Sequence, residues 1–254
     1  MGRCQPVAAK DRHRPYTLKM NELVQRPARP VRKAAGALRA GRAAPAASPS
    51  RTNDPERTMA GILEVALREF ADKGLSGARI DEIAAATRTS KRMIYYYFGS
   101  KEGLYLAVLE HSYREMRRIE GELMLDNLPP EDALRRLVEF TFDHHVANED
   151  YIRIVMNENN ERGKYLAQSQ IIQELNVPAI SAIGRLYERG LAAGVFRQGL
   201  DPVDIHASIS ALTFFNVSNQ YSFGQIFKRD LSASAVRALR RANIVEMVVR
   251  FVRR

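Results

Sequence analysis

Two short amphipathic segments joined by a three-residue link constrain this chain more than any other feature. The first segment predicts a helix from about Ile80 to Ala86, with Ile83 and Ala84 facing inward. The link is Thr87-Arg88-Thr89, and Ser90 can then cap a second helix, KRMIYYYF. Two short helices at this spacing, the second with a basic start, form a helix-turn-helix. We therefore predict a DNA-binding head in this part of the chain.

The second helix has two chemically different faces. Three consecutive tyrosines cannot all point to one side of a helix, so at least one faces outward. Ile94 and Phe98, four residues apart, can face the core together. The opposite face then carries Lys91, Arg92, Tyr95 and Tyr96. Such cations and phenols bind phosphates, guanine edges and thymine methyls, whereas the alternative is a core helix with a solvated charged edge.

Signals on both sides of this motif predict two more helices. The Asn53-Asp54 pair can cap a helix whose apolar residues recur until Lys73-Gly74. Gly99 suits the end of the tyrosine helix, and Ser100 suits the cap of the next one. Lys101 then lies at a helix N-terminus, where backbone amides already favour a phosphate.

Residues 54 to about 110 resemble the DNA-binding head of the tetracycline-repressor (TetR) family. The segments FADKG, IDEIA, SKRMIYYYF and GSKEGLYLAVL carry the resemblance. It implies an all-α fold, with a three-helix helix-turn-helix head over residues 54–103 and a larger helical bundle over residues 104–254 that binds a ligand and forms a two-fold dimer. Two positions depart from the family pattern, because Arg79 stands where threonine is usual and Arg88 where the turn usually has glycine. A positive φ at Arg88 would cost a modest amount of free energy.

The resemblance also implies which residues contact DNA. The set is Arg79, Ser90, Lys91, Arg92, Met93, Tyr95, Tyr96, Tyr97 and Lys101. Within it, Met93 can make only apolar contacts, such as one with a thymine methyl. Tyr97 lies near the side of Ile94 and Phe98, so it can pack in the core instead of binding a phosphate. Lys101 is expected to bind a phosphate.

The formal net charge of +10 comes entirely from residues 1–53. This segment holds twelve Lys and Arg against two acidic residues, and the remainder of the chain is neutral. Its Ala, Pro and Arg content predicts a disordered basic tail. Three explanations stay open: an arm that adds non-specific phosphate affinity, an organelle presequence, or an assigned start upstream of the real one, with Met20 as an internal candidate.

Helical periodicity continues to the end of the chain. The expected helices are Lys101 to Asn127, Pro129 to Ala147, Asp150 to Arg162, Tyr165 to Ala193, Pro202 to Phe227 and Ser234 to Val252. Pro178 should kink the fourth of these or make it restart. The last two carry apolar residues on more than one side, so we expect them to need two packing partners.

A homodimer through these last two helices would supply the second partner. Two heads about one DNA turn apart contact a palindromic double-stranded operator, whereas one short helix contacts few bases. Candidates for the interface are Ala207, Ser208, Ser210, Ala211, Phe214, Phe215, Val236, Leu239, Ile244, Val245 and Val248. The alternative is that these residues form only the core of a single chain.

The resemblance places an inducer pocket in the body. Candidates are polar groups within apolar helices and apolar walls: Phe140, His144, His145, Ile154, Met156, Glu158, Asn159, Tyr187, Phe215 and Asn219. His144 and His145 lie roughly 100° apart on a helix and cannot readily share one metal ion. We expect no metal site and no cofactor beyond an unidentified small-molecule effector.

Other function classes find little support. The chain has no G-x-S-x-G, P-loop or H-E-x-x-H motif, which argues against an enzyme. It has no apolar run near the roughly 20 residues that span a bilayer, and its single cysteine, Cys4, suits a reducing compartment. The sequence thus predicts a cytoplasmic, nucleoid-associated bacterial repressor that a small-molecule inducer releases from a palindromic operator. An activator or a ligand-independent DNA-binding protein with the same head is the alternative.

Overall fold

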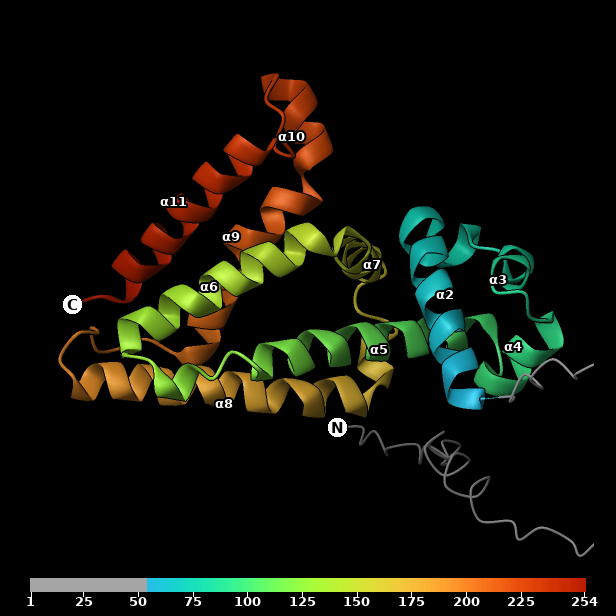
Figure 1. Ribbon diagram of the computed structural model, residues 1–254, viewed down its shortest axis with the longest axis horizontal. Helices are drawn as coiled ribbons and strands as arrows, with labels where there is room; N and C mark the ends of the chain where they lie inside the picture. The colour runs from blue at the N-terminus through green and yellow to red at the C-terminus, as the bar shows by residue number, and fades with distance from the viewer. Residues whose placement is uncertain (1–53) are drawn as a thin grey trace, which may run out of the picture. The chain divides into compact units, whose positions relative to one another are not determined.

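The computed structural model describes residues 54–254, which form helices joined by short loops (Figure 1). The predicted basic tail, residues 1–53, lies outside the described residues. The α-helices are α2 (Pro55–Gly77), α3 (Ile80–Ala86), α4 (Lys91–Phe98), α5 (Lys101–Gly121), α6 (Pro130–Ala147), α7 (Glu149–Asn160), α8 (Gln170–Ala192), α9 (Pro202–Ser218), α10 (Gln220–Phe227) and α11 (Ser234–Val252). Two 3-10 turns are η1 (Leu125–Asn127) and η2 (Leu166–Gln168). The predicted all-α class is confirmed for this part of the chain.

Helices α2, α3 and α4 form the head. Asp54 caps α2, because its carboxylate accepts hydrogen bonds from the backbone amides of Glu56 and Arg57 at 3.1 and 3.2 Å. Gly74, with a φ of +66°, ends the regular part of α2 at the predicted residue. Ile62 of α2 is fully buried in the core that the three helices share. Local sequence signals therefore determine where the first head helix begins and ends.

The turn between α3 and α4 contains an unusual backbone conformation. Arg88 has a φ of +54°, in the left-handed region that glycine adopts more easily. This conformation lets the amide of Thr89 donate to the carbonyl of Ala84 over 3.0 Å, which closes α3. The strain suspected from the missing glycine is therefore present, at a cost of about 1 kcal/mol.

Helix α5 ends earlier than the sequence predicts. It stops at Gly121 and not at Asn127, because Met124 adopts a left-handed φ of +51° and starts η1. Arg189 of α8 holds this turn by donating hydrogen bonds over 2.9 to 3.0 Å to three main-chain carbonyls. The acceptors are Leu125, Asp126 and Leu128. The early end thus depends on a contact between segments that are distant in sequence.

Two other helices also differ from the prediction. Helix α8 begins at Gln170 and not at Tyr165, and it continues through Pro178 without a restart, while the alternative of a kink at Pro178 stays a prediction. Pro178 and Glu174 are both exposed, so water can bond the Glu174 carbonyl that the proline leaves without a helical donor. The expected helix from Pro202 to Phe227 is divided at Asn219, whose φ of −108° and ψ of 5° depart from helical values.

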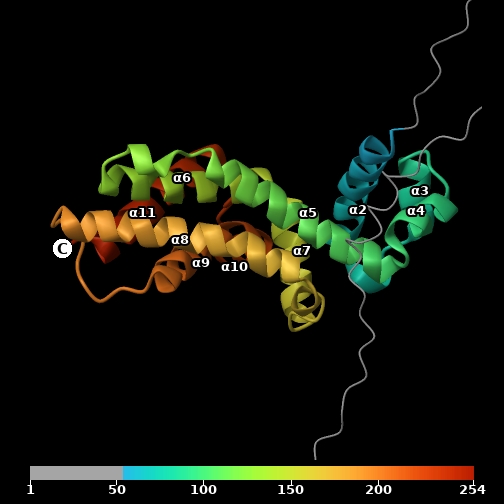
Figure 2. The ribbon, with the colours of Figure 1, turned by 90° about the horizontal axis from the view of Figure 1, so that it is seen from below.

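One hydrophobic core connects the head with the first helices of the body. It includes Phe70 of α2, Tyr105 of α5, Ile154 of α7 and Tyr165. The ring of Tyr105 lies 5.1 Å from that of Phe70 and 5.2 Å from that of Tyr165, between centroids. Figure 2 shows α5 running from the head into the body. The predicted domain boundary between residues 103 and 104 stays a prediction, since this core extends across it.

A second core joins α6, α8, α9 and α11. It contains Ile244, Val245 and Val248, which the sequence assigned to the dimer surface. All three are buried within their own chain, at most 5% exposed. The prediction is therefore wrong for these residues, because the inward stripe of α11 packs on the chain's own helices.

Candidate DNA interface and effector cavity

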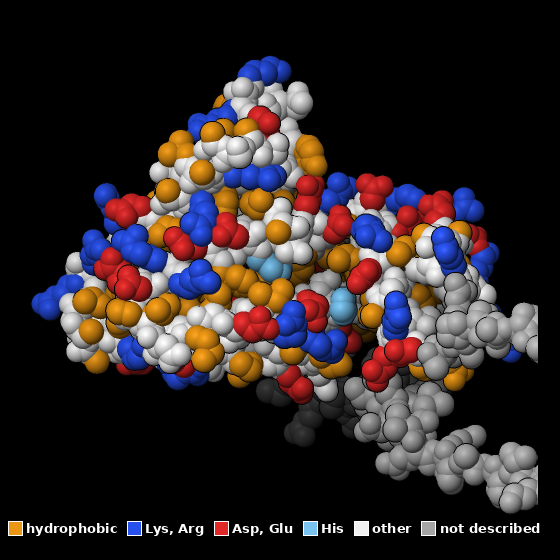
Figure 3. Space-filling model, viewed as in Figure 1, with side chains coloured by type: hydrophobic (Ala, Val, Ile, Leu, Met, Phe, Trp, Pro, Cys, Tyr) orange, Lys and Arg blue, Asp and Glu red, His pale blue; other side chains and the backbone are white. Residues whose placement is uncertain are grey.

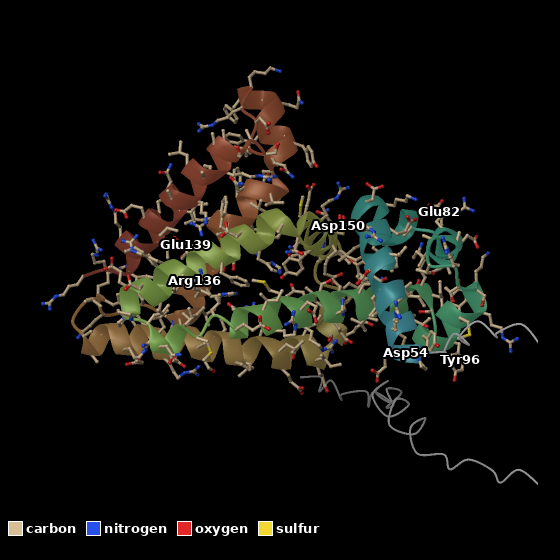
Figure 4. The ribbon with its side chains drawn as sticks, in the orientation of Figure 1. Asp54, Glu82, Tyr96, Arg136, Glu139 and Asp150 are labelled. Carbon is tan, nitrogen blue, oxygen red and sulfur yellow. The ribbon has the colours of Figure 1, made fainter. Side chains whose placement is uncertain are left out.

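The exposed face of α4 is the candidate DNA interface. Ile94 and Phe98 are buried, as their spacing predicts. The exposed side chains of the helix are Lys91, Arg92, Tyr95 and Tyr96. Tyr96 is 64% exposed and Tyr95 is 44% exposed, and Tyr96 lies at the surface of the head (Figure 4). An exposed face that combines cations with phenols can contact both phosphates and base edges.

The remaining predicted contact residues occupy different environments. Met93 and Tyr97 are half-buried, and the ring of Tyr97 packs edge-on against Phe98 with centroids 6.2 Å apart. Ser90 is exposed and caps α4, since its hydroxyl accepts a hydrogen bond from the Met93 amide at 3.2 Å. Arg79 is exposed at the start of α3, and its backbone amide donates to a carboxylate oxygen of Glu69 at 3.0 Å.

Acidic and carbonyl oxygens bind the two lysines that were predicted to contact DNA. Lys91 forms an ion pair with Asp81 of α3. The ammonium group of Lys101 donates to the main-chain carbonyl of Ser76 over 3.2 Å. Figure 3 shows basic and acidic side chains interspersed on the visible face of the head. A lysine ammonium has three N–H donors, so a phosphate oxygen that binds either lysine competes with its present partner or shares the ammonium with it.

The junction of α4 and α5 is closely packed. Ser100 caps α5 by accepting a hydrogen bond from the Gly103 amide at 3.0 Å. A Cβ atom at Gly103 would clash with the backbone carbonyl oxygen of Phe98. Only glycine allows this close approach, so Gly103 determines how α4 is placed on α5.

A cavity of about 540 Å³ lies between the helices of the body. Its lining residues are Tyr113, Met116, Arg117, Glu120, Thr141, His145, Tyr151, Val155, Leu166, Ala167, Ile172, Gln173, Asn176, His206, Ser210 and Phe214. They come from α5 to α9 and from η2. This size and this mixture of apolar and polar groups suit a small organic ligand.

The histidines of the cavity are neutral bases in the folded protein. Burial lowers the pKa of His145 from 6.5 to about 3, and the positive charge of Arg117 contributes to the shift. Burial also lowers the pKa of His206. A neutral imidazole offers one hydrogen-bond donor and one acceptor, so the half-buried ring of His206 can bind a polar ligand.

Of the ten predicted pocket residues, only His145 lines this cavity. Four others line a more open groove of about 370 Å³ between α7 and α9: Met156, Asn159, Phe215 and Asn219. Phe140 and His144 pack together on α6, with ring centroids 5.7 Å apart. Ile154 belongs to the core that includes the head residues.

The last two predicted pocket residues have partners within the fold. Glu158 is fully buried, and its carboxylate accepts hydrogen bonds from the backbone amides of Tyr165 and Leu166 at 2.6 and 2.9 Å. The hydroxyl of Tyr187 donates to the carbonyl of Arg197 over 2.8 Å. Neither residue is among those that line the cavity.

Sequence reasoning missed most of the cavity, including its charged pair. Arg117 and Glu120 resemble an ordinary surface pair three residues apart on a helix. Glu120 nevertheless lies four residues after the buried Met116, and Arg117 lies four residues after Tyr113. Both charges therefore continue the inward stripe of α5, and this pattern is the signal from which a polar interior site could have been predicted.

Helix α7 connects the cavity with the head. Its residues Tyr151 and Val155 line the cavity. Its residue Arg153 donates from Nε to the main-chain carbonyl of Ala71 over 3.1 Å, and Arg153 pairs with Asp72 at 3.3 Å. Because of these bonds, a displacement of α7 by a ligand would also displace α2.

The chain matches two family profiles and a curated relative. "Bacterial regulatory proteins, tetR family" matches residues 62–108, and "Tetracyclin repressor-like, C-terminal domain" matches residues 130–248. The HTH-type transcriptional repressor NicS of Pseudomonas putida is 34% identical over 204 residues, which are 80% of this chain and 96% of NicS. The chain belongs to the tetracycline-repressor (TetR) family.

Further TetR-like proteins support this assignment. The repressor SCO4008 of Streptomyces coelicolor is 35% identical over 54% of this chain and 69% of its own length. The solved structure of the regulator SCO4942 from the same organism is 28% identical, with a TM-score of 0.58, and covers 77% of this chain and 98% of its own. The resemblance predicted from the head motifs is therefore confirmed.

Membership of the TetR family establishes the biochemical class. The protein is a DNA-binding transcriptional regulator, and the family consists of regulators and not of enzymes. Between residues 54 and 254, no helix is long and apolar enough to cross a membrane. Within the same range, no group of three or more His, Cys, Asp or Glu is arranged to hold a metal ion.

Proposed function

We propose that this TetR-family protein is a homodimeric repressor whose two α4 helices bind a palindromic operator and whose effector binds in the 540 Å³ cavity. The observation that carries the proposal is the exposed face of α4, where Arg92 and Tyr96 project from a helix whose other face is buried. The repressor names of NicS and SCO4008 support repression over activation.

Exposed stripes on α9 and α11 support the dimer. On α9, Ala207, Ala211 and Phe215 recur every four residues and are exposed. On α11, the exposed large apolar residues are Leu239, Met247 and Phe251. Hydrophobic side chains lie at the surface over α10 and α11 (Figure 3). A second copy related by two-fold symmetry would cover both stripes and set the distance between the two heads.

Two helices support communication between effector and operator. Helix α5 contributes Arg117 to the cavity and Tyr105 to the core that contains the head residues. Helix α7 contributes Tyr151 to the cavity and binds α2 through Arg153. An effector that favours one placement of these helices would favour one head spacing and thereby lower operator affinity.

Selection of DNA from a random double-stranded pool tests the proposal. The protein should enrich a palindrome, and the double variant Arg92→Ala, Tyr96→Ala should enrich no sequence while keeping its helical circular dichroism. Arg185→Ala, which changes an exposed arginine of α8, is the control and should enrich the same palindrome. Enrichment of no sequence by the unchanged protein would overturn DNA recognition, and a motif without two-fold symmetry would overturn the dimer. A promoter fusion assayed with and without the protein separates repression from activation.

A further inference from the structure

The cavity is charged at one place. Among its lining residues, only Arg117 and Glu120 carry full charges, and the two side chains form an ion pair. Arg117 also donates from Nε to Oδ1 of Asn176 over 3.0 Å, and the Asn176 amide is held by the carbonyl of Ile172 at 2.6 Å. Side chains of α5 and α8 thus orient the guanidinium before any ligand arrives.

The positive charge of Arg117 outweighs the negative charge of Glu120 inside the cavity. Burial lowers the pKa of His206 most, Arg117 lowers it further, and Glu120 raises it by less. Burial raises the pKa of Tyr151 most and Tyr113 raises it further, while Arg117 lowers it by more than Glu120 raises it. Of the charged pair, Arg117 therefore acts more strongly than Glu120 on both groups, which favours an anion over a cation.

The rest of the cavity wall offers aromatic rings. The rings of Tyr113 and Tyr151 meet edge-on with centroids 5.7 Å apart, and those of His145 and Phe214 with centroids 6.1 Å apart. These rings can pack against the apolar body of a ligand whose polar group reaches Arg117.

We infer that the effector is a small organic anion, bound through its negative group by Arg117 and packed through its apolar body against the rings of Tyr113, Tyr151 and Phe214. This inference rests on the proposed function, because it assigns a chemical class to the ligand of the same cavity. The anion competes with Glu120 for the guanidinium, so Glu120 weakens binding and excludes anions that interact poorly with the rings.

Titration calorimetry with three probes tests the charge preference. Benzoate, benzamide and benzylamine share one ring and are anionic, neutral and cationic. The full chain should bind benzoate most tightly and benzylamine least. Arg117→Met should weaken benzoate binding by roughly tenfold to a hundredfold, the effect of losing a charge-assisted hydrogen bond. Arg118→Met is the matched control, because Arg118 is the next residue of α5 but is exposed and pairs with Glu115 and Glu122.

A second variant changes affinity in the opposite direction. Glu120→Gln removes the competing carboxylate and should tighten benzoate binding. If Arg117→Met does not fold, this variant still tests whether the anion binds Arg117. Equal affinities for the three probes, no binding of benzoate, or tighter binding of benzylamine would overturn the inference. The inference would also be overturned if Arg117→Met lost as much affinity for benzamide as for benzoate. Failure of the proposed function is distinguishable, because DNA selection is done without any probe.

Discussion

Asn157 of α7 donates a hydrogen bond from its side-chain amide to the main-chain carbonyl of Phe70 in α2 over 3.0 Å. Replacing Asn157 with alanine removes this bond between body and head, so it should lower the free energy of unfolding by about 1 kcal/mol. Urea unfolding followed by circular dichroism measures the change. Asn159→Ala is the control, because Asn159 is exposed and its amide bonds only Val155 within α7. Equal losses in the two variants would contradict a role for Asn157 in joining head and body.

Two glycines should respond to alanine in opposite directions. Gly103→Ala should lower the free energy of unfolding by roughly 1–3 kcal/mol, because the new methyl group meets the Phe98 carbonyl. It should also abolish DNA selection, since α4 must move. Gly61→Ala places a methyl group within α2 where nothing lies within 4 Å, and should raise stability by roughly 0.5–1 kcal/mol. Thermal unfolding of both variants checks the pair, and destabilisation by Gly61→Ala would refute the packing argument.

Stability should fall as the pH is lowered from about 7.5 to about 5.5. Burial lowers the pKa of His145 from 6.5 to about 3, so the folded protein leaves His145 neutral over this range while the unfolded chain takes up a proton. A folded-state pKa below the unfolded one stabilises above the unfolded pKa, and that contribution is lost as the pH falls towards about 3. His145 alone should account for about 1.4 kcal/mol. Urea unfolding at both pH values measures this, and an unchanged pH dependence in His145→Asn would exclude His145 as the source.

A charge on the exposed stripe of α11 should separate the proposed dimer. Leu239 is 51% exposed, and Leu239→Arg would place two like charges near each other across a two-fold interface. Sedimentation equilibrium should then report a monomer with unchanged helical circular dichroism. Val177→Arg is the matched control, since Val177 is an exposed apolar residue of α8 and belongs to neither stripe. A dimer that tolerates Leu239→Arg would place the interface elsewhere.

Release of Lys91 from its acidic partner should strengthen DNA binding. Asp81→Asn removes the ion pair with Lys91 and a negative charge near the proposed interface. Both side chains are about half exposed, so the effect on stability should stay within about 0.5 kcal/mol. Fluorescence anisotropy with a labelled duplex should show tighter binding and a steeper dependence on salt. Asp126→Asn, at an exposed pair with Arg185 in the body, should change neither.

Local signals allowed most of the head to be predicted. The caps at Asp54, Ser90 and Ser100 depend on a side chain and amides two or three residues away, so the sequence alone determines them. The two faces of α4 follow from the spacing of Ile94 and Phe98. Contact of this face with DNA stays a prediction.

Features formed by distant segments could not be predicted in this way. The early end of α5 is held by Arg189, which lies more than sixty residues further along the chain. The cavity arises where side chains from five helices fail to fill the space between them, and a single-helix pattern does not report that space. Pocket candidates chosen for polarity, such as Glu158 and Tyr187, are instead hydrogen-bonded elsewhere in the fold.

The ring of Tyr105 lies between those of Phe70 and Tyr165, and this contact makes the stability of the head depend on that of the body. Because head and body share these buried rings, neither part can lose its order without exposing apolar surface of the other. Heating should therefore melt the described region in one cooperative transition, without a folded head beside an unfolded body. Exchange of the DNA-binding helices between relatives would succeed only if the matching residues of α5 and α7 were exchanged with them.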